Sequence, residues 1–157
     1  MSAGRLRWPL VLPWIVATLA FAQAPPRETL PDAEWREIRT IVEAQREALV
    51  AGKAEQAFGY ASPGIREQFG DAQTFLSMVR QSYAALVEAR DAALLDGAVI
   101  EGRVIQPMRL VLPDNTVLIA LYTMERSRGG AWRIAGCILA PSTLKAVEAG
   151  KRVAMRG

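Results

Sequence analysis

The feature that most constrains the fold of this 157-residue chain is a change of pattern near Arg90. Before that point, apolar residues recur at the three- and four-residue spacing of amphipathic helices. After it, runs rich in valine, isoleucine and leucine are separated by turn residues, which is the pattern of strands. Helices followed by strands predict a single α+β domain in which the N-terminal helices cover one face of a curved antiparallel sheet.

Capping residues divide the first half of the chain into separate helices. We expect helices within residues 29–53, 54–61, 62–70 and 71–89, because each range combines an apolar stripe with a start or stop signal. The first helix should begin at Thr29 or Asp32 and end at Gly52. The third should begin at Ser62 and Pro63 and end at Gly70, and the last should begin at Asp71.

Three later runs, residues 93–112, 116–126 and 131–140, predict the strands. The turn residues 113–115 and 129–130 between the runs are short, which favours an antiparallel meander. Pro107 has no amide hydrogen, so we expect its strand to lie at an edge or to carry a bulge.

Both faces of the run 116–126 are apolar. Val117, Ile119 and Leu121 alternate with Leu118, Ala120 and Tyr122, which form the opposite face. One face should meet the helices, and the simplest cover for the other is a second copy of the protein, although the remaining chain could also supply it. In the run 131–140, alternation places Trp132, Ile134 and Ile138 on one side and Arg133, Cys137 and Leu139 on the other.

The N-terminus has the pattern of a secretory signal peptide. Arg5 and Arg7 precede an apolar run that ends in Ala20-Phe21-Ala22, a cleavage site before Gln23. The alternative, an uncleaved anchor, would be short, since a span needs about 20 apolar residues. We therefore expect a signal peptide over residues 1–22, a domain over 30–141, a tail over 142–157, periplasmic or secreted location and no stable membrane anchor after cleavage.

Charge gives no evidence for a nucleic-acid partner. The formal net charge is +3, and cleavage after Ala22 would leave 17 basic and 16 acidic residues, or +1. Arg126, Arg128 and Arg133 could form a local positive patch, but a solvated face accounts for such spacing equally.

Several chemistries are excluded because the chain has no histidine and only one cysteine, Cys137. Histidine-dependent triads and histidine-bearing metal sites cannot form, and the thiol has no histidine to activate it. One cysteine cannot make a disulfide within the chain, and we interpret Cys137 as a small buried residue in a strand. We expect neither a metal nor a cofactor.

Two blocks resemble a known family. The segments "AFGYASPGIREQFGDAQTFLSMVRQSY" and "LYTMERSRGGAWRIAGCIL" are similar to a bacterial family of exported domains of unknown function, numbered 4864. That family looks like a branch of the cone-shaped superfamily typified by nuclear transport factor 2 and ketosteroid isomerase. The resemblance implies no activity, and after Tyr83 this chain lacks the aromatic and proline-containing stretch that such proteins carry.

The superfamily's isomerases imply one catalytic alternative, in which a buried Asp moves a proton and a Tyr hydroxyl stabilises an enolate. The carboxylates of this chain are explained as caps, turn residues and strand ends. We therefore expect a non-catalytic module that binds a small apolar ligand or a protein partner, with an isomerase or dehydratase as the alternative. The candidate cavity residues are Tyr60, Tyr83, Tyr122, Arg80 and Trp132.

Overall fold

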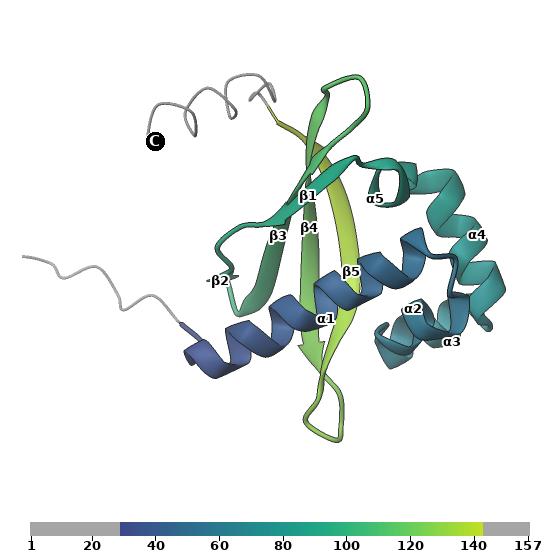
Figure 1. Cartoon of the computed structure of the whole chain (residues 1–157). Coiled ribbons are helices and arrows are strands. Elements are labelled where there is room, and N and C mark those ends of the chain that lie inside the picture. The colour runs from purple at the N-terminus through teal and green to yellow at the C-terminus, as the bar shows by residue number, and fades with distance from the viewer. Residues whose placement is uncertain (1–28, 143–157) are drawn as a thin grey trace, which may run out of the picture.

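Five helices precede five strands in the computed structural model, which describes residues 29–142 (Figure 1). This order confirms the predicted α+β class. The predicted signal peptide, residues 1–22, and the predicted tail beyond Ser142 lie outside the described residues. Between residues 29 and 142, no helix combines the length and the apolar character that a membrane crossing requires.

The helices are α1 (Asp32–Val50), α2 (Ala54–Gly59), α3 (Pro63–Phe69), α4 (Ala72–Ser82) and α5 (Ala84–Glu88). The Ser62 hydroxyl caps the start of α3 by accepting a hydrogen bond from the Ile65 amide at 3.3 Å. Gly70 ends α3 with a φ of 76°. The Asp71 carboxylate accepts the amides of Gln73 and Thr74 at 2.9 Å and so begins α4, as predicted.

Two details of the helices differ from the prediction. No side chain caps α1, which starts after Pro31, so the expectation of a cap at Thr29 or Asp32 was wrong. The segment predicted as one last helix is two, because the backbone leaves the helical region at Tyr83, where φ is −129°. This break turns α5 away from α4 and leaves Tyr83 between them.

The strands are β1 (Asp91–Leu94), β2 (Ala98–Ile100), β3 (Arg103–Val111), β4 (Val117–Arg126) and β5 (Trp132–Pro141). They form one antiparallel sheet in the order β1-β3-β4-β5, with β2 also paired to β3. The first predicted run therefore contains three strands, since residues 95–97 and the Glu101-Gly102 turn interrupt it. The predicted turns at 113–115 and 129–130 are confirmed.

Pro107 lies in β3, which has partners on both sides, so the expectation of an edge or a bulge was wrong. It sits where β1 has ended and β2 has not begun, opposite Leu95. The Leu95 amide donates to the Pro107 carbonyl at 3.0 Å, but proline cannot return the bond. Gln106 Nε2 donates to the Leu95 carbonyl instead, at 2.7 Å, so a buried side chain replaces the missing amide.

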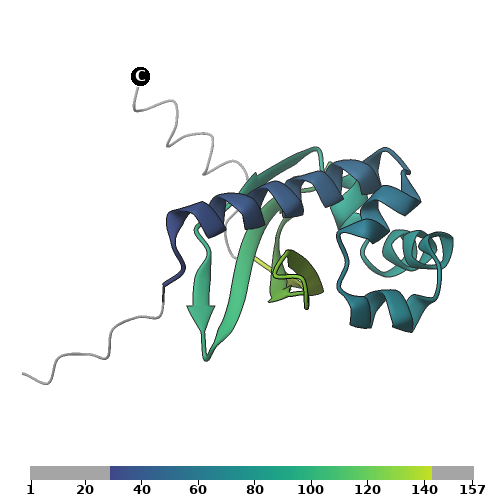
Figure 2. The ribbon, with the colours of Figure 1, turned by 90° about the horizontal axis from the view of Figure 1, so that it is seen from below.

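The two faces of the sheet have different cover. The sequence analysis expected one of the two apolar faces of β4 to meet the helices. It is the face of Leu118, Ala120 and Tyr122 that does so, and Tyr122 is fully buried. On the opposite face, Ile119 and Leu121 are half-buried, and Ile138 is 65% exposed. Figure 2 shows α1 lying across the first of these faces.

A β-bulge corrects the predicted faces of β5. The register places Met124 opposite Ile134 but Thr123 opposite Gly136, so Ala135 is an extra residue. Because the bulge inverts the alternation, Trp132, Ile134, Cys137 and Leu139 all share the helix-facing side, whereas Ile138 faces outward. The prediction that separated Cys137 from Trp132 and Ile134 was therefore wrong.

The helices α2, α3 and α4 form a group, called the helical group below. The connection between α2 and α3 attaches this group to the outer edge of β5. The Ile134 amide donates to the Tyr60 carbonyl at 3.0 Å, and the Ser62 amide donates to the Ile134 carbonyl at 2.8 Å. These two bonds form a short parallel bridge between Ala61 and Ile134. As a result, α2, α3 and α4 gather beside β5 and do not lie flat on the sheet (Figure 1, Figure 2).

Candidate functional site

A cavity of about 220 Å³ lies between this helical group and β5. Its wall combines residues of α1, α3, α4 and α5 with the helix-facing side of β4 and the bulged part of β5, and it is half open to solvent. The lining residues are Gln45, Leu49, Ile65, Gln68, Phe69, Phe75, Met78, Val79, Tyr83, Leu86, Tyr122, Ile134, Ala135, Gly136 and Cys137.

The chemistry of this wall is apolar and uncharged. Its aromatic part is built by Phe75, whose ring centroid lies 5.8 Å from that of Phe69 in an edge-on arrangement. Polar groups come only from two glutamines, two tyrosines and one thiol. The Gln45 carboxamide is fixed, because its Nε2 donates to the Ala57 carbonyl at 3.2 Å.

Tyr122 is the most buried polar residue in the wall. Its side chain is fully buried, and its hydroxyl has no hydrogen-bond partner within the described structure. Desolvation by burial, with a smaller contribution from Cys137, raises the pKa of this phenol far above its usual value of 10.0, although the positive charge of Arg46 opposes the shift. The phenol is therefore neutral and keeps its proton, which makes it a hydrogen-bond donor.

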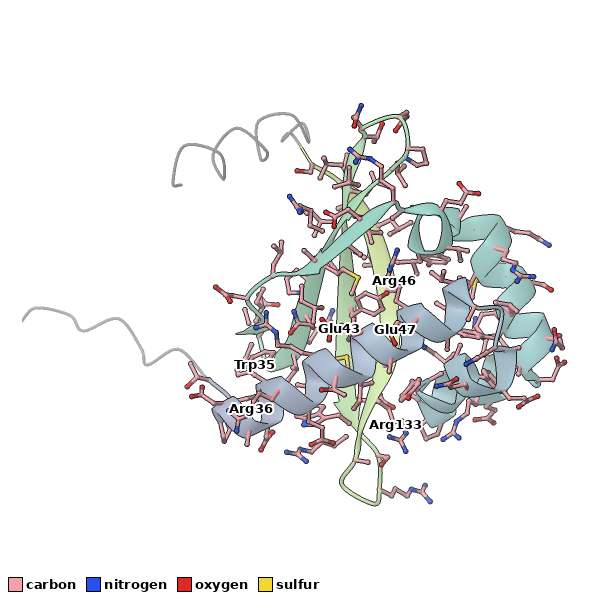
Figure 3. The ribbon with its side chains drawn as sticks, in the orientation of Figure 1. Trp35, Arg36, Glu43, Arg46, Glu47 and Arg133 are labelled. Carbon is pink, nitrogen blue, oxygen red and sulfur yellow. The ribbon has the colours of Figure 1, made fainter. Side chains whose placement is uncertain are left out.

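Two further buried polar atoms belong to neighbours of Tyr122. Gln106 stands directly opposite Tyr122 in the β3–β4 register, and its Oε1 is buried without a partner. Arg46 reaches from α1 to the end of α5, where its Nη2 donates to the Ala89 carbonyl at 2.9 Å, and its Nε is buried without a partner (Figure 3). Neither residue is part of the cavity wall, so the charge of Arg46 lies behind the cavity surface.

Cys137 stands directly opposite Tyr122 on β5 and lines the cavity. Burial raises the pKa of the thiol to about 12, so it is protonated at neutral pH. A protonated thiol is a poor nucleophile. Cys137 therefore contributes a small, weakly polar surface to the wall. It is a strand residue, as interpreted from the sequence, but it is half-buried and not fully buried.

Of the five candidate residues predicted from the sequence, Tyr83 and Tyr122 lie in the cavity wall. The other three lie elsewhere. Tyr60 is the C-cap of α2, and its carbonyl holds the edge of β5. Arg80 is exposed on α4, and Trp132 is buried under the Arg126 guanidinium, which lies 4.5 Å from the ring centroid.

Carboxylates are missing from the wall. Every Asp and Glu between residues 29 and 142 is exposed except Glu34, which is half-buried and pairs with Arg126. Hydrogen bonds from Thr74 lower the pKa of Asp71, and those from Thr116 lower the pKa of Asp114, as expected for a cap and a turn. The carboxylate that an isomerase would need beside a tyrosine is therefore missing from this cavity. In the described part of the chain, no cluster of metal-ligating residues occurs.

Sequence analysis missed the residues that give the cavity its shape. Gln45 and Met78 are ordinary members of helical stripes, and Ala135 and Gly136 look like ordinary strand residues. The available signal was the Ala-Gly pair between Ile134 and Cys137, because glycine inside a strand often marks a bulge. That signal would have located the bulge but not the cavity.

The fold and this cavity define the class of protein, an α+β domain with helices on one face of an open antiparallel sheet and a half-open apolar cavity at one end. The chain belongs to the family described as Domain of unknown function (DUF4864), whose model matches residues 31–147, well over half of its length. No curated protein matches the chain.

Proposed function

We propose that this domain is a non-catalytic module that binds a small apolar molecule in the cavity between the helical group and β5. The observation that carries the proposal is the composition of the wall, which is apolar and contains no charged side chain. Ligand sites are typically concave and apolar with a few fixed polar groups, and this wall has that character. The lack of a carboxylate at the cavity favours binding over proton transfer.

The size of the cavity limits the ligand. An apolar protein cavity of about 150 Å³ accommodates one benzene molecule. A volume of about 220 Å³ therefore suits one ring with a short substituent, or a branched chain of similar bulk. The part of the ligand that the cavity encloses is smaller than a sterol or a long-chain lipid, and a longer molecule would extend through the open side.

Filling the cavity tests this proposal. Met78 lines the cavity from α4, and its neighbour Ser77 is exposed on the same helix, so Met78→Trp and Ser77→Trp form a matched pair. We expect cumene, a neutral hydrocarbon of one ring, to bind the wild type and the Ser77→Trp variant in calorimetric titrations. Binding should be lost in Met78→Trp, while circular dichroism shows that this variant remains folded.

A wild type that binds neither cumene nor acetophenone, a ketone of similar size, would refute the proposal. So would equal binding by the two tryptophan variants, since the site would then lie elsewhere. Mass spectrometry of the denatured, purified protein complements the titrations, because a retained ligand should be a small neutral molecule that Met78→Trp fails to carry.

We also propose that two copies associate through the outward face of the sheet. The support is Ile138, which is 65% exposed beside the half-buried Ile119 and Leu121. A C2 dimer would bury the same patch from both copies. Analytical ultracentrifugation at micromolar concentration tests this. We expect a dimer that Ile138→Glu dissociates, and a wild-type mass of one chain would reject the dimer.

The remaining proposals concern location and ancestry. We propose that the domain is exported and starts at Gln23, on the strength of the N-terminal pattern. N-terminal sequencing of the mature protein should then begin at Gln23, whereas a start at Met1 would contradict it.

We further propose that the family is a branch of the nuclear transport factor 2-like superfamily, supported by the order of helices before a curved antiparallel sheet.

A further inference from the structure

We infer that the molecule bound in this cavity is uncharged and carries a hydrogen-bond acceptor, to which the Tyr122 hydroxyl donates. This inference rests on the proposed binding function and specifies the chemistry of the ligand. It assigns Tyr122 as the residue that selects and orients the ligand.

The first step concerns the unpaired hydroxyl. A buried polar group without a hydrogen bond costs free energy, and such groups are rare in native proteins. Tyr122 lines the cavity, is fully buried and has no partner among residues 29–142. Because the hydroxyl is buried, the wall side chains must shift for a ligand to reach it. An acceptor that does so would remove that cost, so binding of a molecule with an acceptor is favoured over binding of a pure hydrocarbon of the same shape.

The second step concerns the direction of the hydrogen bond. The raised pKa of Tyr122 means that the phenol stays protonated, so it can donate to a carbonyl, ether or similar oxygen. Cys137, directly opposite, is protonated as well and is only a weak donor and acceptor. The ligand therefore meets one strong donor at this side of the cavity.

The third step concerns charge. A carboxylate buried in an apolar cavity needs a cationic partner or several donors, because its desolvation is costly. None of the lining residues is cationic. Arg46 acts electrostatically on Tyr122, but its guanidinium donates to the Ala89 carbonyl and the residue is not part of the wall. An anion would thus lose its water without gaining an ion pair, which selects a neutral ligand.

Three probes of similar shape separate these steps. Cumene has no acceptor, acetophenone has one neutral acceptor, and benzoate has a charge. Each is titrated into the wild type, Tyr122→Phe and Tyr60→Phe. Tyr60 is the matched control, since it is a half-buried tyrosine at the end of α2 that does not line the cavity.

We expect Tyr122→Phe to weaken acetophenone about fivefold, the value of one hydrogen bond, and to leave cumene within twofold. Tyr60→Phe should change neither probe, and benzoate should bind more weakly than acetophenone. Infrared spectra of wild-type protein provide a second measurement that needs no variant. The carbonyl stretch of bound acetophenone should move to lower frequency than in an apolar solvent, and the shift should be absent in Tyr122→Phe.

The outcomes distinguish this inference from the proposed function. If neither cumene nor acetophenone binds the wild type, the binding function fails and the inference fails with it. If cumene binds but Tyr122→Phe affects both probes equally, the cavity binds ligands and the role of Tyr122 is refuted. If benzoate binds more tightly than acetophenone, the cavity selects anions and the inference is overturned. An unshifted carbonyl stretch overturns it as well.

Discussion

The interface between α1 and the sheet is packed differently at its two ends. At the end that we call closed, the Trp35 ring lies against Gly97 beside β2 and Ile38 is fully buried (Figure 3), although a second hollow, lined by Thr29, Trp35 and residues 97–101, lies next to this contact. At the open end, the C-terminal part of α1 and the helices α3, α4 and α5 surround β5 and leave the cavity.

The difference has a backbone cause at each end. Gly97 has no side chain, so the Trp35 ring can lie directly on the chain between β1 and β2. At the open end, the helical group is attached to the edge of β5 through Ile134, and the inward residues beyond the bulge include the small Cys137. The comparison teaches that one layer of similar composition can be packed core at one end and line a cavity at the other.

Truncating a buried aliphatic residue at each end should give the largest difference. Ile38 is fully buried on α1 one turn from Trp35, whereas Leu49 is equally buried but lines the cavity. Changes of a core isoleucine or leucine to alanine cost about 2–5 kcal/mol, more where the surroundings cannot relax. We expect Ile38→Ala near the upper end of that range and Leu49→Ala near the lower end, measured by urea denaturation. Equal costs would mean that the cavity is packed as tightly as the core.

Adding one methyl group at the closed end should have the next largest effect. A Cβ at Gly97 would collide with the Trp35 ring, whereas a Cβ at Gly129 would meet nothing within 4 Å. We expect Gly97→Ala to destabilise the fold by about 1–3 kcal/mol, as overpacking does. Gly129→Ala, the control, should change the midpoint of thermal unfolding little. A neutral Gly97→Ala would show that the closed end has spare room.

The hydrogen bond that compensates for Pro107 gives a smaller, conditional effect. Gln106→Leu removes the donor to the Leu95 carbonyl, which should cost about 1 kcal/mol. In the Pro107→Ala background a backbone amide becomes available opposite Leu95, so Gln106→Leu should cost less there. A double-mutant cycle in urea measures the coupling. Identical costs in both backgrounds would remove the compensating role assigned to Gln106.

Local signals in the sequence predicted most of the fold. Ser62, Gly70 and Asp71 act within four residues of their own position, so their capping roles could be predicted without knowledge of the rest of the chain. The α+β class followed from periodicity for the same reason, and periodicity also grouped Leu118, Ala120 and Tyr122 on one face without deciding that this face is the inward one. Tyr83 and Tyr122, two of the five candidate site residues, were predicted because large aromatics occur on the elements that meet in the core.

The errors involve contacts between distant parts of the chain. Ala135 bulges because β5 pairs with β4 on one side and with the α2–α3 connection on the other, and neither partner can be inferred from its own sequence. Pro107 is tolerated in a central strand only because Gln106 bonds to Leu95. The cavity depends on the same distant pairing, which is why its wall could not be assembled from local patterns.

The thiol at the open end gives the smallest effect, a change of stability with pH. The folded protein holds the Cys137 proton up to a pKa of about 12, whereas an unperturbed thiol releases it near 9.0. Because the pKa is raised on folding, the stabilising contribution is complete below pH 9 and is lost as the pH rises from there toward 12. Thermal unfolding between pH 8 and 11 should therefore show a steeper loss of stability for the wild type than for Cys137→Ala. The other titrating groups are common to both proteins, so parallel curves would mean that the thiol is as hydrated in the cavity wall as in the unfolded chain.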